Sequence, residues 1–96
     1  MPISVDYIWS QEKNDLLKVE RGVSFEEIVV AIESENFLDI LDHPNQEQYP
    51  NQYFFVVRIK GYVWLVPFVR DGKQCFLKTA FPSRKANKTY SGDSND

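Results

Sequence analysis

Positively charged side chains are concentrated in the second half of this sequence. Residues 49–96 carry 8 Lys and Arg side chains and 3 acidic ones, whereas residues 1–48 carry 3 Lys and Arg side chains and 11 acidic ones. The net charge of the whole sequence is −3. A local concentration of cations attracts phosphate groups whatever the overall charge of the molecule. The candidates for phosphate contact are Arg58, Lys78, Arg84, Lys85 and Lys88. The alternative is that folding interleaves the two halves, so that the charges cancel as ordinary surface pairs.

Few other side chains in the sequence could do catalytic or metal chemistry. The only histidine, His43, lies in a polar segment between Asp42 and Pro44, which is more typical of an exposed loop residue than of a general base. One cysteine and one histidine can build neither a disulfide nor a structural zinc site. Glu26 and Glu27 are spaced as solvated helix residues rather than as catalytic carboxylates. We therefore expect no metal, no cofactor and a reducing cytoplasmic location.

The length and composition fit one domain. The chain has 96 residues, 43% of them apolar, which is enough for a single core. We expect one domain over residues 1–90 and a disordered polar tail over 91–96. No segment approaches the roughly 20 apolar residues that span a bilayer, so no membrane partner is expected.

The first half predicts a strand and two helices. A strand at a sheet edge is expected over residues 3–9, followed by a helix over 11–21 that Ser10 caps and Gly22 ends. The buried face of this helix is predicted to carry Leu16, Leu17 and Val19.

The second helix has the clearest start signal in the sequence. Ser24 and Glu27 form an S-x-x-E capping box, with Val23 placed to pack on Ile28. Its buried stripe is predicted to be Phe25, Ile28, Val29 and Ile32. A short strand over 37–41 and a loop over 42–52 follow.

Residues 52–81 predict a three-stranded antiparallel meander. Lys60-Gly61 and Asp71-Gly72 are turn signals that separate strands at 52–59, 62–70 and 73–81. Two-residue turns would pair residue 59 with 62 and residue 70 with 73. Pro67 removes a ladder hydrogen bond, so a bulge is expected there. The fold class is therefore α+β, with an N-terminal strand and two helices on one face of the meander, and a short C-terminal helix.

The alternation of side chains along the meander separates two faces. The face that carries Phe55, Val57 and Phe81 is apolar enough to lie under the helices. The opposite face is predicted to include Ala80, and it places Arg58 and Lys78 about 12 Å apart. It also carries apolar residues suited to a protein partner or a homodimer contact. These partner-binding candidates are Phe54, Val56, Leu65 and Phe76.

A short basic helix is predicted to follow the meander. Ser83 can cap it, and Arg84 and Lys88 then lie one turn apart on the same side. Like charges at this spacing oppose helix formation by a few tenths of a kcal/mol, which an anion between them would relieve. A solvated terminal helix with no ligand is the other interpretation.

Several segments together resemble the BrnT-like toxins of bacterial type II toxin–antitoxin systems. They are Gly22-Val23-Ser24-Phe25-Glu26-Glu27 after a charged helix, and Pro82-Ser83-Arg84-Lys85-Ala86-Asn87-Lys88 with a tyrosine after the sheet. The order of elements over about residues 6–90 is similar too. The resemblance implies a RelE-like fold, ribonuclease activity that inhibits translation, and neutralisation by a DNA-binding antitoxin in a hetero-oligomer. The chain departs from the family at Glu20-Arg21 and at Gln52-Tyr53.

Metal-independent RNA cleavage needs an activated 2′-OH, stabilisation of charge on the phosphorane, and a proton for the leaving oxygen. We expect Arg84 and Lys78 to stabilise this charge, and Tyr90 to transfer a proton or stack on a base. Arg58, Lys85 and Lys88 are expected to bind the RNA backbone. No general base is evident. Two other hypotheses stay open: a non-catalytic module that binds a protein through the mixed sheet face, and an RNA-binding protein that does not cleave.

Overall fold

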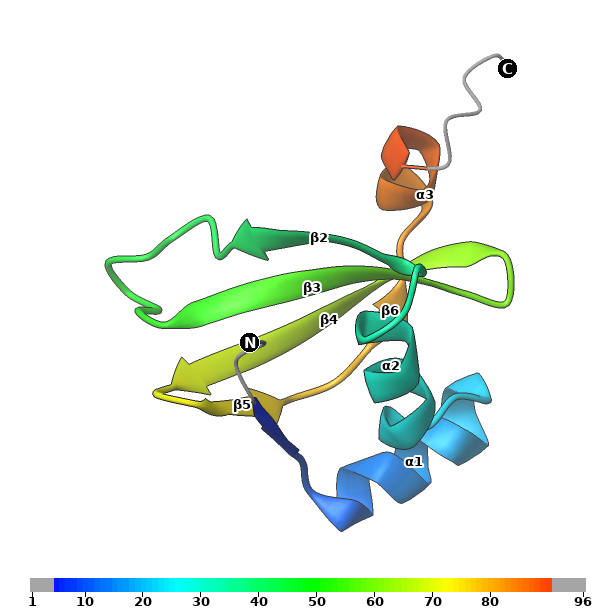
Figure 1. Ribbon diagram of the computed structural model, residues 1–96, viewed down its shortest axis with the longest axis horizontal. Helices are drawn as coiled ribbons and strands as arrows, with labels where there is room; N and C mark the ends of the chain where they lie inside the picture. The colour runs from blue at the N-terminus through cyan, green and yellow to red at the C-terminus, as the bar shows by residue number, and fades with distance from the viewer. Residues whose placement is uncertain (1–4, 91–96) are drawn as a thin grey trace.

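Three helices and a mixed sheet of six strands form the part of the chain that the computed structural model describes, residues 5–90 (Figure 1). The predicted α+β class is confirmed. The strands are β1 (Asp6–Ile8), β2 (Phe37–Asp42), β3 (Gln52–Ile59), β4 (Tyr62–Asp71), β5 (Gln74–Leu77) and β6 (Phe81–Pro82). The helices are α1 (Gln11–Arg21), α2 (Phe25–Ile32) and α3 (Arg84–Tyr90). The tail predicted over 91–96 lies outside the described residues.

The sheet has the order β1-β5-β4-β3-β2, and β6 also pairs with β4. β2 with β3, β3 with β4, and β4 with β5 form antiparallel pairs. β1 pairs with β5 in parallel, with Tyr7 opposite Cys75. The N-terminal strand therefore lies at an edge, as predicted, although residues 3 and 4 of the predicted range lie outside the described residues. None of the helices within residues 5–90 is long and apolar enough to cross a membrane.

The ends of α1 match the prediction, but its buried face does not. Ser10 accepts a hydrogen bond from the Lys13 amide at 3.3 Å, and Gly22 ends the helix at a φ of 70°. Leu17 is buried, yet 45% of Leu16 and 84% of Val19 is exposed.

The residue that replaces Leu16 and Val19 on the buried side of α1 is polar. Asn14 is fully buried, and its side chain accepts from the Phe25 amide at 2.7 Å and donates to Glu26 Oε1 at 2.9 Å. The bond from the Phe25 amide satisfies one of the first-turn amides of α2, which have no partner within the helix, and the bond to Glu26 joins the two helices through their side chains. The need to cap α2 therefore sets the rotation of α1, and the predicted burial of Leu16 and Val19 was wrong.

α2 begins at the predicted capping box. Ser24 Oγ accepts from the Glu27 amide at 3.1 Å, and the side chains of Phe25, Ile28 and Ile32 are buried against the sheet. Val29 is only partly buried, and Ala31 completes the buried stripe. Figure 1 shows α1 and α2 together on one side of the sheet.

The first hairpin of the meander has the predicted register. Ile59 lies opposite Tyr62, and Lys60 and Gly61 have φ angles of 56° and 79°. Positive φ at both turn residues gives the two-residue turn whose twist matches that of the strands. The core face of β3 and β4 follows from this register and carries Phe55, Val57 and Val66 as predicted.

The second turn differs from the prediction by one step. Arg70 lies opposite Cys75 and Asp71 opposite Gln74, so the turn residues are Gly72 and Lys73 rather than Asp71 and Gly72. The predicted pairing of residues 70 and 73 was wrong. Because each partner moves by two positions, the side chains keep their faces, and Cys75 and Leu77 lie in the core.

The irregularity that Pro67 was expected to cause lies in the neighbouring strand. The β3–β4 pairing continues through Pro67, but β5 ends at Leu77. Lys78 N donates to Pro67 O at 2.9 Å, and proline has no N–H with which to return the bond.

The segment from β5 to β6 has one residue more than the stretch of β4 that it faces. Phe68 lies opposite Leu77, whereas Leu65 lies opposite Phe81, so the faces exchange between β5 and β6. Ala80 is consequently buried in the core, and Phe81 shares the face of Leu65. Both predicted positions were therefore wrong.

Candidate functional site: the second face of the sheet and helix α3

α3 packs on the face of the sheet opposite to α1 and α2, near the β3–β4 turn (Figure 1). Ser83 starts the helix as predicted, because its hydroxyl accepts from the Ala86 amide at 3.1 Å. The helix covers Val56 and Val63, both fully buried, with Ala86 packed against them. A small apolar contact therefore fixes where the cationic helix lies.

Three hydrogen bonds attach α3 to the sheet. Val63 N donates to Asn87 Oδ1 at 3.1 Å, Arg58 Nη2 donates to the Tyr90 carbonyl at 3.2 Å, and Tyr90 Oη donates to Asp39 Oδ2 at 2.8 Å. A guanidinium at the carboxyl end of a helix also interacts favourably with the helix dipole. Arg58 and Tyr90, predicted for RNA contact and catalysis, both take part in this attachment.

The hydrogen bond to Asp39 changes the acid–base behaviour of Tyr90. The bond, then burial, and then the Asp39 charge raise the pKa of the Tyr90 phenol above its ordinary value of 10.0. The phenol is thus fully protonated near neutral pH and cannot act as a base there. Its proton points to Asp39, and the catalytic role of Tyr90 stays a prediction.

The three cationic side chains of α3 are exposed and unpaired. Arg84, Lys85 and Lys88 all face solvent. Within residues 5–90, none of the three nitrogen groups forms an ion pair with a carboxylate. Within the described part of the chain, the acidic side chains of the first half therefore do not pair with the cations of α3.

Other cations of the chain bind backbone carbonyls. Lys60 Nζ donates to the Gly22 carbonyl at 3.0 Å, and Arg70 Nε donates to that of Gly72 at 3.0 Å. Arg21 Nη1 similarly donates to the Ala80 carbonyl. Arg21 and Lys60 thereby join distant segments of the fold, whereas the Arg70 bond is local to the β4–β5 turn.

Lys78 is exposed but lies some distance from α3. Its amide is opposite Pro67, whereas Ser83, which starts α3, donates to the carbonyl of Val63. Four residues of β4 separate these points, or about 13 Å along the strand. The corrected register also widens the predicted 12 Å between Arg58 and Lys78 to about 16 Å between backbone positions. The structure therefore does not group Lys78 closely with the α3 cations.

The four residues predicted for partner binding differ in exposure. Val56 is fully buried beneath α3 and offers a partner no surface, so its inclusion was wrong. Phe54 and Leu65 are half-buried, and 38% of Phe76 is exposed. Partner binding by these three residues stays a prediction.

Two exposed residues of the same face were not predicted. Leu41 lies opposite Phe54 and is 37% exposed, and Ile8 lies opposite Phe76 and is 41% exposed. Both come from the edge strands β2 and β1, whose registers no turn signal fixed. The apolar part of this face is therefore wider than the meander alone.

His43 has a structural environment. Its Nδ1 accepts from the Asn45 amide at 3.0 Å, and its ring lies 4.5 Å from that of Tyr49 and 5.9 Å from that of Phe54. These contacts order the loop between β2 and β3 and agree with its interpretation as a loop residue.

No group of three or more His, Cys, Asp and Glu side chains in the described part of the chain is placed to hold a metal ion. No protein-family model matches the sequence, and no curated protein matches it.

Proposed function

We propose that this protein is the toxin of a type II toxin–antitoxin system and acts in the cytoplasm as a metal-independent endoribonuclease that inhibits translation. The proposal includes a RelE-like fold and neutralisation by a DNA-binding antitoxin. The observation that carries it is α3, a helix fixed to the sheet that exposes three unpaired cations. An array of fixed cations with no carboxylate partner is suited to a phosphate backbone.

In this proposal the side chains divide into three groups. Arg84 and Lys78 would stabilise charge on phosphate, and because they lie on separate segments they would contact different phosphates of one strand. Lys85 and Lys88 would hold the RNA backbone. Arg58 and Tyr90 position the helix through the bonds described above.

Binding is tested first, with a fluorescently labelled single-stranded RNA and anisotropy measured over a range of salt concentrations. Arg84→Ala and Lys88→Ala should each weaken binding and reduce the slope of log K against log salt by about 0.7. The matched control is Lys18→Ala, an exposed cation of α1 on the other side of the sheet. Equal affinities for all these variants would refute the assignment of α3.

Activity is tested by induced expression and by incubation of purified protein with RNA. We expect the parent to halt growth and to cut RNA in the presence of a metal chelator, and Arg84→Ala to lose both effects. Co-expression of the neighbouring gene product should restore growth. Intact RNA together with salt-dependent binding would instead indicate an RNA-binding protein that does not cleave.

The exposed apolar face supports a second candidate, a non-catalytic module that binds a protein. Ile8 and Phe76 are register partners and expose two apolar side chains next to each other, and Leu41 exposes a further apolar position at the opposite edge of the sheet. Phe76→Asp should then abolish binding to the neighbouring gene product, or self-association measured by light scattering, without changing RNA anisotropy. A protein that neither halts growth nor binds RNA, yet loses its partner in this variant, would favour the module over the toxin.

A further inference from the structure

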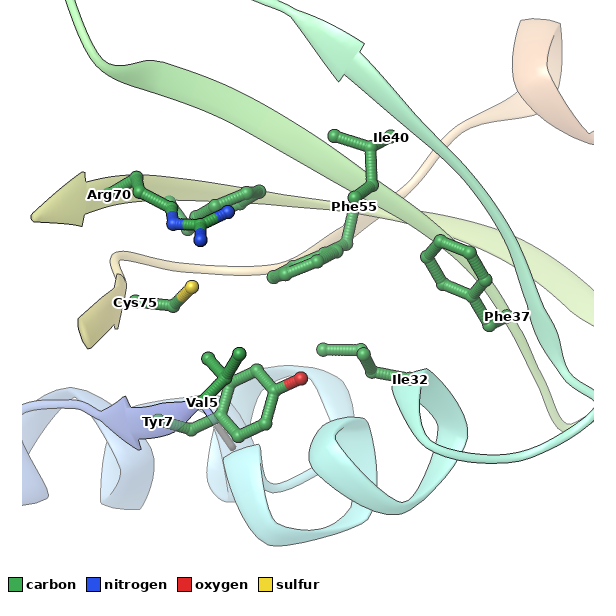
Figure 2. A pocket seen from close by; sticks show the side chains of 9 residues that line it. Val5, Tyr7, Ile32, Phe37, Ile40, Phe55, Arg70 and Cys75 are labelled. Atoms are coloured by element: carbon green, nitrogen blue, oxygen red, sulfur yellow. The ribbon is translucent and has the colours of Figure 1, made fainter. Parts of the chain in front are cut away.

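The core face of the sheet is hollowed beside α2 and β1. A cavity of about 220 Å³ lies between α2, β1 and the sheet (Figure 2). An adjoining hollow of about 400 Å³ shares Ile40, Phe68 and Arg70 with it. We call these two adjoining spaces together the hollow. The hollow lies on the face of the sheet opposite to α3.

The walls of the hollow are mostly apolar and partly aromatic. The rings of Phe55 and Phe68 stack with centroids 3.9 Å apart, and Phe37 meets Phe55 edge-on at 6.4 Å. On the open side, 47% of Ile40 and 37% of Phe37 is exposed. Such a concave, solvent-accessible aromatic surface is typical of a site for an apolar ligand.

Arg70 places a positive charge at this apolar wall. Figure 2 shows its side chain beside that of Cys75 at one end of the hollow. Its Nε donates to the Gly72 carbonyl at 3.0 Å, while its two Nη groups have no partner among residues 5–90. A guanidinium held at Nε with both Nη groups free can form a two-point bond to a carboxylate.

The polar groups around the hollow limit where an anion can bind. Burial raises the pKa of the Cys75 thiol and of the Tyr7 phenol, so both are neutral at ordinary pH. The Glu33 carboxylate raises the pKa of Tyr7 further, whereas Arg70 acts in the opposite direction on both groups. Arg70 is thus the charged side chain among the residues that line the cavity.

We infer that the hollow binds a small carboxylic acid with an apolar chain or ring, whose carboxylate pairs with Arg70 and whose apolar part lies against Phe55 and Phe68. The size is appropriate, since a cavity of about 150 Å³ already admits benzene. The inference is independent of RNA binding because the site lies on the other face of the sheet.

The test is calorimetric titration of the full chain with octanoate, octanol and octylamine, which differ only in the head group. We expect octanoate to bind and the other two to bind about tenfold more weakly or not at all. Arg70→Met should reduce octanoate affinity about tenfold, whereas Lys73→Met, which removes an exposed cation of the adjacent turn, should not. Equal affinity for octanol, or for Arg70→Met, would overturn the inference.

A second variant and a map of the bound site distinguish binding in the hollow from binding elsewhere on the protein. Ile40→Asp changes an exposed position of an edge strand, so the chain should still fold, as circular dichroism would verify. The new negative charge should abolish octanoate binding. In amide NMR spectra octanoate should shift Tyr7, Phe55 and Cys75. Shifts centred on Arg84, Lys85 and Lys88 would show general anion attraction to α3 and would contradict the proposal.

Discussion

Replacement of Tyr90 by phenylalanine separates a positioning role from a catalytic one. The substitution keeps the ring that packs beside Val56 and Ala86 but removes the 2.8 Å bond from the hydroxyl to Asp39. Hydrogen bonds to charged groups contribute about 1.5–3 kcal/mol when well buried. Because this pair is only partly buried, we expect Tyr90→Phe to cost about 1 kcal/mol, or a melting temperature about 4–8 °C lower.

The measurement is urea unfolding of four proteins: the parent, Tyr90→Phe, Asp39→Asn and the double variant. These four proteins form a double-mutant cycle, which should give a coupling free energy between Tyr90 and Asp39 of about 1 kcal/mol. Tyr49→Phe is the matched control, since the Tyr49 hydroxyl is bonded to no residue within 5–90 and its loss should change little.

The pH dependence of unfolding gives a second readout. The folded-state pKa of Tyr90 is raised, so its contribution to stability is complete below the ordinary value of 10.0 and is lost as the pH rises through the folded value. The parent should therefore lose its advantage over Tyr90→Phe in that alkaline range.

RNA assays on the same proteins decide the role of Tyr90. If it only positions α3, Tyr90→Phe should retain cleavage under conditions in which it is fully folded. Loss of cleavage with unchanged stability would refute the reasoning and restore Tyr90 as a catalytic residue.

Three further predictions concern stability. Asn14→Ala should cost about 2–3 kcal/mol in urea unfolding, because it leaves the buried Phe25 amide unsatisfied; Val19→Ala, on the exposed face of the same helix, should change stability by less than about 0.5 kcal/mol. The hydrogen bond from Asn14 is the main cause that lowers the pKa of the Glu26 carboxyl, so Glu26 contributes stability that is present above the ordinary pKa of 4.5 and is lost as the pH falls through the folded value; acid titration of Asn14→Ala should show a smaller loss. Gly61→Ala should cost about 1 kcal/mol by thermal melting, since its φ is 79° and no atom lies within 4 Å of an added Cβ; an unchanged melting temperature would contradict the backbone explanation.

Local signals predicted the elements because their physical causes are local. The capping box at Ser24 and Glu27, the left-handed Gly22 and the turn at Lys60-Gly61 each depend on residues a few positions apart. The rotation of α1 is different, because Asn14 is buried to satisfy an amide of another helix. An apolar pattern alone favoured Leu16 and Val19 over an asparagine.

The functional surface was less predictable for the same reason. Arg84 and Lys88 are exposed, as expected from their spacing of one helical turn, but the cover over Val56 depends on how α3 docks. That docking uses Asp39 and Arg58, which lie far from the helix in sequence. No short motif marks such contacts, so a charge pattern could indicate a phosphate surface but could not tell binding residues from positioning residues.

The parallel pairing of β1 with β5 has a consequence for how the chain folds. Asp6 aligns with Gln74, so most of the described residues must be available before this edge of the sheet can form. Pairings between such distant segments carry a loop-closure cost and slow folding. During synthesis, α1 and α2 emerge long before the strands that cover their apolar sides. The nascent chain therefore cannot bury Phe25 and Ile28 against the sheet until the meander is complete, and apolar surface exposed in this way favours aggregation.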